Sequence, residues 1–212
     1  MSRIGLVPMA AKPYHAGHDL LVRLAVHEND AVYVYASMAD RDEVSGKAME
    51  QIWKELIEPT LPANVKVEYV TSPVGQVFAT LGEANKSASS DVFSIYSDPT
   101  DVNKNFKTLD RYAADLLANG QIKLRGVDRS STVNVSGTQM RKWLADGDKD
   151  SFIAHLPKKI DGEKVWSLLT TTKPESKSKK TAKPATKKAP ASKGTKSEGL
   201  LRSYIRLALD DK

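Results

Sequence analysis

The sequence predicts an α/β fold in which helices cover a mostly parallel sheet. Short apolar runs rich in Val, Ile and Tyr alternate with stretches in which apolar residues recur every three or four positions. Strands separated by helical stretches imply right-handed crossovers between parallel strands. The 212 residues are 40% hydrophobic and 27% charged, which suits one ordinary core and an appendage.

Five segments have the composition of strands. The first is a short apolar run that ends in a polar loop, the second is rich in Val and Tyr, and the third alternates apolar with polar residues. We expect strands at residues 3–9, 31–38, 65–71, 91–96 and 121–127. Ligands of such sheets bind at the carboxyl ends of the strands, where the strand order reverses.

Helices are expected between these strands. Ser72 and Pro73 are typical of a helix start, as N-cap and first-turn residue, while Pro59 and the pair Asn119-Gly120 mark helix ends. The expected helices span residues 15–29, 47–58, 72–85, 108–118 and 136–145, with a shorter one near 149–155.

The basic character of the chain is confined to its last quarter. Residues 1–157 carry 17 Lys and Arg against 20 Asp and Glu, a balance of −3, whereas residues 158–212 carry 15 against 6, a balance of +9. Residues 172–196 contain no Val, Ile, Leu, Met, Phe, Tyr or Trp, so they cannot bury enough apolar surface to fold. We therefore expect a folded domain at residues 1–170 and a disordered basic linker at 171–196.

Residues 197–212 have the pattern of a short amphipathic helix. Ser197 can cap it, and the apolar side chains are Leu200, Leu201, Tyr204, Ile205 and Leu209. A single helix of this length is not stable alone, so its apolar face predicts docking onto a protein partner or onto the body. For the lysine-rich linker we favour a solvated tether, with nucleic-acid contact as the alternative.

The composition excludes several classes of protein. The chain has no cysteine, which excludes a disulfide scaffold, a thiol nucleophile and a Cys-ligated zinc site. No apolar run approaches the roughly 20 residues that span a bilayer, and the first residues lack the apolar stretch of a secretory signal. We expect a cytoplasmic protein without a membrane partner.

The first expected helix begins with residues that favour phosphate binding. Lys12 precedes His15, Gly17 and His18, which lie where the helix opens after the first strand. A helix N-terminus offers unpaired N–H donors and the positive end of the helix dipole, and two imidazoles add directional donors. Gly17 leaves room for the backbone to approach a phosphate, and Lys12 adds a charge.

A second helix start follows the fifth strand and carries Ser136, Gly137, Thr138 and Arg141. Its hydroxyls lie near free N–H groups, and the guanidinium one turn further on offers a fork of donors. Ser136 and Thr138 also suit the ordinary role of N-cap residues. Two anion-binding helix starts that both follow strands predict a polyphosphate held between them.

Two other strand ends carry polar residues at the same edge of the sheet and supply further candidates for a binding site. Ser37 and Arg41 follow the second strand, and Ser97 and Asp98 follow the fourth. Arg41 offers a guanidinium that suits a phosphate, while Asp98 is equally suited to a turn. Asp101 and Lys104 are secondary candidates.

These motifs, in this order, resemble the nucleotidylyltransferase superfamily, the cytidylyltransferase-like group with an HxGH signature. The strand, His15-Ala16-Gly17-His18 and the helix match its first motif, and Ser136-Gly137-Thr138-x-x-Arg141 resembles its late motif, within residues 3–157. The resemblance implies a Rossmann-like three-layer fold. It also implies that His15 and His18 contact a triphosphate and that Ser136, Thr138 and Arg141 hold its β- and γ-phosphates. The acceptor would then lie at the other two strand ends, where Arg41 would meet its phosphate and Ser37, Ser97 and Asp98 are further candidates.

The implied activity is transfer of a nucleoside monophosphate from ATP or CTP to a phosphorylated small molecule, with release of pyrophosphate. Adenylyltransferases of the nicotinamide-mononucleotide type and cytidylyltransferases for a phosphorylated alcohol both fit. The acceptor's own phosphate attacks, so no nucleophilic side chain is needed, and Mg²⁺ on the phosphates would neutralise charge without a dedicated protein metal site.

Two further interpretations concern the setting of this activity. The chain also resembles short phage-encoded members with similar basic linkers, which would place it in the host cytoplasm. The alternative function is a non-catalytic binding or scaffold protein that keeps the nucleotide-binding fold and is recruited to a partner by residues 197–212.

Overall fold

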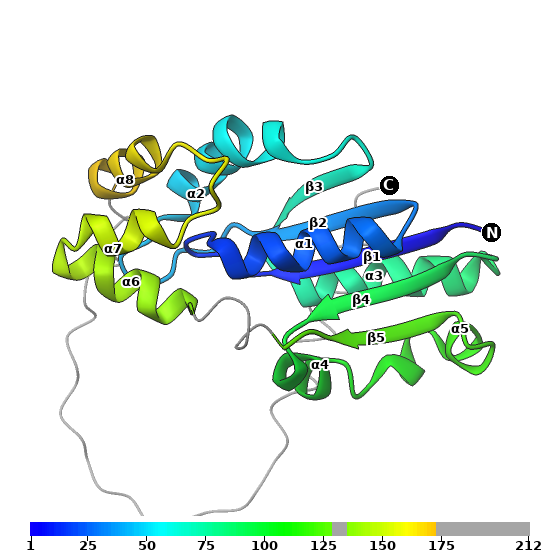
Figure 1. The fold of residues 1–212 in the computed structure, drawn as a ribbon. Helices are drawn as coiled ribbons and strands as arrows, with labels where there is room; N and C mark the ends of the chain where they lie inside the picture. Colours follow the sequence, from blue (N-terminus) through cyan, green and yellow to red (C-terminus); the bar gives the residue numbers. More distant parts are fainter. Residues whose placement is uncertain (129–134, 173–212) are drawn as a thin grey trace, which may run out of the picture. The chain divides into compact units, whose positions relative to one another are not determined.

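A computed structural model describes residues 1–128 and 135–172 (Figure 1). The chain divides into two units, Met1–Ser176 and Lys177–Lys212, and the second lies outside the described residues. The expected helix at 197–212 and the expected linker from residue 173 onward therefore lie outside them as well.

The first unit is built on one parallel sheet of five strands in the order β3-β2-β1-β4-β5. The strands are β1 (Arg3–Met9), β2 (Ala31–Ser37), β3 (Val65–Val70), β4 (Val92–Ser97) and β5 (Ile122–Gly126). In the register, Ile4 of β1 lies opposite Ala31 of β2 and Phe93 of β4. The expected α/β fold with a parallel sheet is confirmed.

The strand order reverses at the centre of this sheet. The chain first adds β2 and β3 on one side of β1, and then crosses over to place β4 and β5 on the other side. Connections that leave β1 and β4 therefore run in opposite directions. Such a reversal leaves a crevice outside the carboxyl ends of the two central strands, which end here at Met9 and Ser97.

Helices lie on both faces of the sheet, with α1 on one face and α3 on the other (Figure 1). The helices are α1 (Ala16–Glu28), α2 (Gly46–Ile52), α3 (Pro73–Lys86), α4 (Pro99–Asn105), α5 (Ala114–Ala118), α6 (Gly137–Asp146), α7 (Lys149–Ala154) and α8 (Gly162–Thr171). Among the described residues, no helix combines the length and the apolar character needed to cross a membrane.

Side chains alternate between two apolar cores, as expected for strands covered on both faces. Val7 and Val34 point into the core shared by α1, α2, α6, α7 and α8, whereas the neighbouring Leu6 and Tyr35 point into the core under α3 and α5. All four are at most 2% exposed.

Two expected helices are broken into shorter pieces. The segment at 47–58 consists of α2, a π-helical turn at Trp53–Ile57 and a 3-10 turn at Glu58–Thr60, where Pro59 has no N–H to continue the helix. The segment at 108–118 consists of a 3-10 turn at Leu109–Arg111 and the separate helix α5.

The structure also contains two helices that the sequence analysis did not predict. Asp98 caps α4 by accepting a hydrogen bond from the Thr100 N–H, and Pro99 occupies its first turn. Asp161 caps α8 in the same manner by accepting from the Lys164 N–H. Helix α8 packs against α2 and α7.

Helix α2 begins in close contact with the end of β2, and this contact generates a stability prediction. A Cβ atom on Gly46 would lie 2.0 Å from the Met38 carbonyl oxygen, so we expect Gly46→Ala to lower the free energy of unfolding by about 2–3 kcal/mol or more. The matched control is Gly82→Ala in α3, where the nearest atom to the new Cβ is 3.7 Å away.

Chemical denaturation measures both variants. We expect Gly82→Ala to be neutral or to stabilise the fold by up to about 1 kcal/mol, because alanine favours a helix interior. Equal effects of the two substitutions would contradict the packing of α2 against β2.

Candidate functional site

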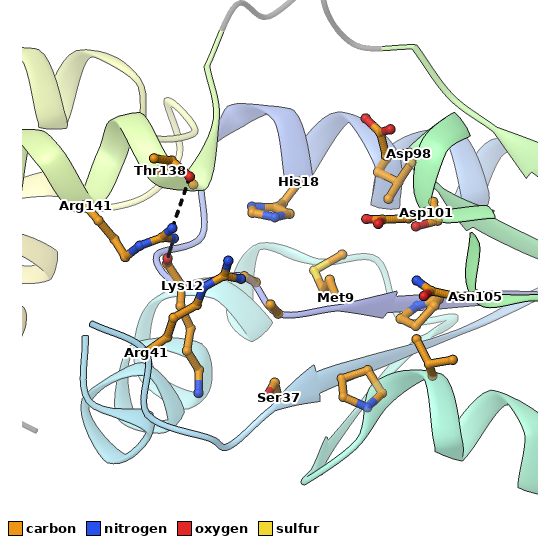
Figure 2. Close-up of a pocket in the computed structure, with 18 residues that line it drawn as sticks. Met9, Lys12, His18, Ser37, Arg41, Asp98, Asp101, Asn105, Thr138 and Arg141 are labelled. Atoms are coloured by element: carbon orange, nitrogen blue, oxygen red, sulfur yellow. Dashed lines mark hydrogen bonds between the residues drawn. The ribbon is translucent and has the colours of Figure 1, made fainter. Parts of the chain in front are cut away.

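A cavity of about 360 Å³ opens where the strand order reverses. Its walls come from the segments after β1, β2 and β4 and from the starts of α3 and α6. The lining residues are Pro8, Met9, Ala10, Ala11, Lys12, His18, Leu21, Ser37, Arg41, Pro73, Val74, Ser97, Asp98, Asp101, Asn105, Gly137, Thr138 and Arg141. Segments far apart in the sequence therefore share one site (Figure 2).

Most of the residues singled out from the sequence meet in this cavity. They are Lys12, His18, Ser37, Arg41, Ser97, Asp98, Asp101, Gly137, Thr138 and Arg141, whereas the secondary candidate Lys104 is not among the described lining residues. In the described part of the chain, His15, Gly17 and Ser136 are not among the lining residues. His15 and Ser136 are the N-cap residues of α1 and α6, whose first turns reach the cavity.

His15 is the N-cap residue of α1 and is only 2% exposed. Its Nδ1 accepts a hydrogen bond from the Gly17 N–H at 3.1 Å, which leaves the ring proton of a neutral imidazole on Nε2. The His15 ring lies 3.9 Å from the His18 ring, measured between centroids. In this structure His15 therefore supports the position of His18.

His18 is held between aromatic rings on the first turn of α1. Its ring stacks on Tyr14 at a centroid distance of 5.7 Å and an angle of 19°, and Tyr14 in turn packs edge-on against Trp53. Burial raises the pKa of Tyr14 well above its usual value, and the neighbouring Asp19 adds to the increase. Tyr14 therefore stays neutral, and the His18 ring has a fixed place facing the cavity (Figure 2).

Arg141 links the start of α6 to the loop after β1. Its Nη1 donates to the Lys12 carbonyl oxygen at 2.9 Å, and its Nη2 donates to Thr138 Oγ1 at 3.1 Å (Figure 2). Its Nε forms an ion pair with Asp42 at 2.7 Å. A Cβ on Gly137 would lie 3.2 Å from Arg141 Nη1, so glycine at this position leaves room for the guanidinium.

Ser136 is the N-cap residue of α6. Its Oγ accepts a hydrogen bond from the Gln139 N–H at 3.1 Å, which is the ordinary capping role that the sequence also allowed. The N–H groups of the first turn of α6 still lie at the positive end of the helix dipole. Gly137 and Thr138 bring this turn to the cavity.

Lys12 is a buried cation beside the cavity, with 3% of its surface exposed. Among the described residues, its Nζ has no hydrogen-bond partner. Burial lowers the pKa of Lys12 to about 8, with Asp40 acting in the opposite direction and Arg41 adding to the decrease. An ammonium group left in this state destabilises a fold, and such groups cluster at functional sites.

The opposite end of the cavity carries carboxylates. Asp98 and Asp101 lie there with Asn105, at the start and along one face of α4 (Figure 2). Asp98 Oδ1 accepts from the Thr100 N–H at 3.0 Å. The cavity therefore has a cationic end, formed by Lys12, Arg41 and Arg141, and a carboxylate end.

Sequence reasoning missed several residues of this site. Pro73 and Val74 line the cavity from the start of α3, and Asn105 lines it from α4. The sequence did contain a signal for Pro73 and Val74. Ser72-Pro73 is a helix start directly after a parallel strand, like the starts of α1 and α6 that the sequence analysis selected. The contact between Asp42 and Arg141 joins distant segments and has no local signature.

No family model and no curated protein matches this sequence. Among solved structures, the chain is similar to a protein of Vibrio parahaemolyticus that is provisionally assigned as a nicotinate-nucleotide adenylyltransferase. The identity is 16%, the match covers 80% of this chain and 99% of that chain, and the TM-score is 0.53. This likeness confirms the Rossmann-like fold.

A second similar structure is TmcAL of Thermotoga maritima, bound with alpha-thio ATP. The identity is 13%, the match covers 81% of this chain and 55% of that chain, and the TM-score is 0.48. The chain thus spans about half the length of TmcAL.

The burial of Lys12 generates a prediction about stability and pH. Its folded-state pKa of about 8 lies below the ordinary value of 10.5, so between these pH values the unfolded chain holds more protons. Stability therefore rises as the pH increases through this window, and the penalty is fully present below it. We expect Lys12→Met to raise the free energy of unfolding at pH 7 by roughly 2–3 kcal/mol.

Urea denaturation at pH 7 and pH 10 tests this expectation. The gain from Lys12→Met should shrink at the higher pH, and Lys47→Met, at an exposed position of α2, should change little at either. A gain that is the same at both pH values would show that the ammonium charge of Lys12 carries no penalty.

Proposed function

We propose that this protein is a nucleotidyltransferase that transfers a nucleoside monophosphate from ATP or CTP to a phosphorylated small-molecule acceptor and releases pyrophosphate. The observation that carries the proposal is the convergence of His18 and Arg141 on one cavity where the strand order reverses. The resemblance of the two motifs to the nucleotidylyltransferase superfamily supports it. The likeness in fold to the Vibrio protein agrees with it.

The cationic end of the cavity suits the triphosphate. Arg141, Thr138 and the first turn of α6 would hold the β- and γ-phosphates, and His18 would face the α-phosphate. An oxygen of the acceptor phosphate attacks the α-phosphorus, the bond from that phosphorus to the bridging oxygen breaks, and pyrophosphate leaves with the electron pair. A donor at His18 would stabilise the charge that develops on the α-phosphate.

The acceptor would lie across the carboxyl ends of β2 and β4. Arg41 lines the cavity from the loop after β2, beside Ser37, and offers a cation to the acceptor phosphate. Ser97 and Asp98 line the other side and offer polar groups to the rest of the acceptor or to the ribose. Holding the two phosphates in line supplies much of the rate enhancement in such a reaction.

Magnesium fits this site as a companion of the nucleotide. Among the described residues there is no cluster of three or more His, Asp or Glu placed to hold a metal ion. Mg²⁺ often takes most of its ligands from phosphates and water and only one or two from carboxylates, and Asp98 and Asp101 are the carboxylates that line the cavity. When bound, the ion would neutralise phosphate charge.

Pyrophosphate release tests the proposal, measured with ATP or CTP across a panel of phosphorylated acceptors. We expect His18→Ala to lower kcat by about 100-fold or more, because it removes a donor at the reacting phosphate. His27→Ala, at an exposed position near the end of α1, is the matched control and should keep full turnover.

Two results would contradict the proposed function. One is the absence of pyrophosphate release by the unmodified protein with every pair of nucleotide and acceptor. The other is unchanged turnover in the His18→Ala protein, which would place the chemistry outside this cavity.

A further inference from the structure

The loop after β2 brings a carboxylate of the protein to the guanidinium that the proposed function assigns to phosphate. Asp42 Oδ2 lies 2.7 Å from Arg141 Nε. The Arg141 side chain is 11% exposed, whereas the Asp42 side chain is 65% exposed. An ion pair with one partner so well solvated adds little to the stability of a fold. Its main consequence is instead that a negative charge lies beside the guanidinium of Arg141.

The loop that carries Asp42 is built to hold this position. Arg41 and Val44 exchange backbone hydrogen bonds of 3.0 and 2.9 Å, which closes a tight turn around Asp42 and Glu43. Val44 is fully buried. At the base of the loop, Asp40 Oδ1 accepts from the Gly46 N–H at 2.7 Å. These contacts fix the position of the turn that carries Asp42.

The backbone conformation of Asp42 is also consistent with a fixed turn at this position. Its φ of 51° lies in the left-handed region, which aspartate and asparagine adopt more readily than other residues that carry a side chain. A two-residue turn closed by Arg41 and Val44 needs a positive φ at its first central position, which Asp42 supplies. The turn thus holds Asp42 beside Arg141.

A carboxylate paired with an arginine occupies a position that a phosphate oxygen can also take. Two donors of Arg141 are directed to Lys12 and Thr138, while Asp42 forms an ion pair at the Nε side of the guanidinium. We propose that Asp42 is an internal competitor that occupies Arg141 when no nucleotide is bound and that phosphate displaces it. Asp42 thereby lowers the affinity of the cavity for pyrophosphate and for nucleoside triphosphates. This inference rests on the proposed function.

Such a competitor would serve the release of product. Pyrophosphate dissociates from the same guanidinium that held the β- and γ-phosphates. The adjacent Asp42 carboxylate can then replace pyrophosphate at Arg141. The competitor acts on binding and not on the chemical step, so its removal is expected to tighten the binding of product together with that of substrate.

Isothermal titration with magnesium pyrophosphate and with magnesium ATP tests the proposal on the full chain. We expect Asp42→Asn to bind pyrophosphate about fivefold more tightly than the unmodified protein, because the competing charge is lost. Asparagine tolerates the left-handed backbone, so the turn is kept. The matched control is Glu43→Gln, which removes the neighbouring charge of the same turn and should change affinity by less than about twofold.

The possible results separate this proposal from the proposed function. If the unmodified protein binds pyrophosphate but Asp42→Asn binds it equally or more weakly, the competitor is overturned and the nucleotidyltransferase proposal stands. If Asp42→Asn and Glu43→Gln tighten binding equally, the effect comes from the loss of any negative charge near the cavity. The proposal that Asp42 competes for Arg141 is then overturned as well. If neither the unmodified protein nor the variants bind pyrophosphate or ATP, both proposals fail.

Discussion

The hydrogen bond from Arg141 Nη1 to the Lys12 carbonyl oxygen joins two segments that lie 129 residues apart. On one side is the loop that leads from β1 into α1, and on the other is the first turn of α6. Charge-assisted hydrogen bonds contribute about 1.5–3 kcal/mol where they are shielded from water, and Arg141 is largely shielded. A second tie, from the Ala16 N–H to the His155 carbonyl oxygen at 3.0 Å, fixes the end of α7 at the start of α1. These contacts bring two helix starts to one cavity.

The charged groups around the cavity lower the stability of the fold while no ligand compensates them. Lys12 is buried without a described partner for its Nζ. This burial lowers stability and places a positive charge beside the cavity. The carboxylates of α4 oppose the cations across the cavity.

Much of the fold was predictable because its signals are local. The first strand was expected at 3–9 and spans Arg3–Met9, since its apolar run stops at a polar loop. The expected helices at 47–58 and 108–118 were wrong in detail, because apolar periodicity does not distinguish a continuous helix from a series of short turns. Helix α4 was not predicted, although the pair Asp98-Pro99 is a regular helix start.

The site was predictable to the extent that parallel strands end on one edge. That rule placed His18 and Arg141 in a common cavity before any contact was known. It could not show that His15 and Ser136 serve as helix caps, because a cap and a phosphate ligand require the same residue types at the same positions. Nor could it find Asp42, whose partner is set by tertiary packing alone.

A crystal structure of the protein with magnesium and a non-hydrolysable ATP analogue tests the central claim most directly. The account predicts that β- and γ-phosphate oxygens lie within hydrogen-bond distance of the Arg141 guanidinium, with the α-phosphate facing the His18 ring. A nucleotide bound with its phosphates toward Asp98 and Asp101, or in another part of the molecule, would contradict it.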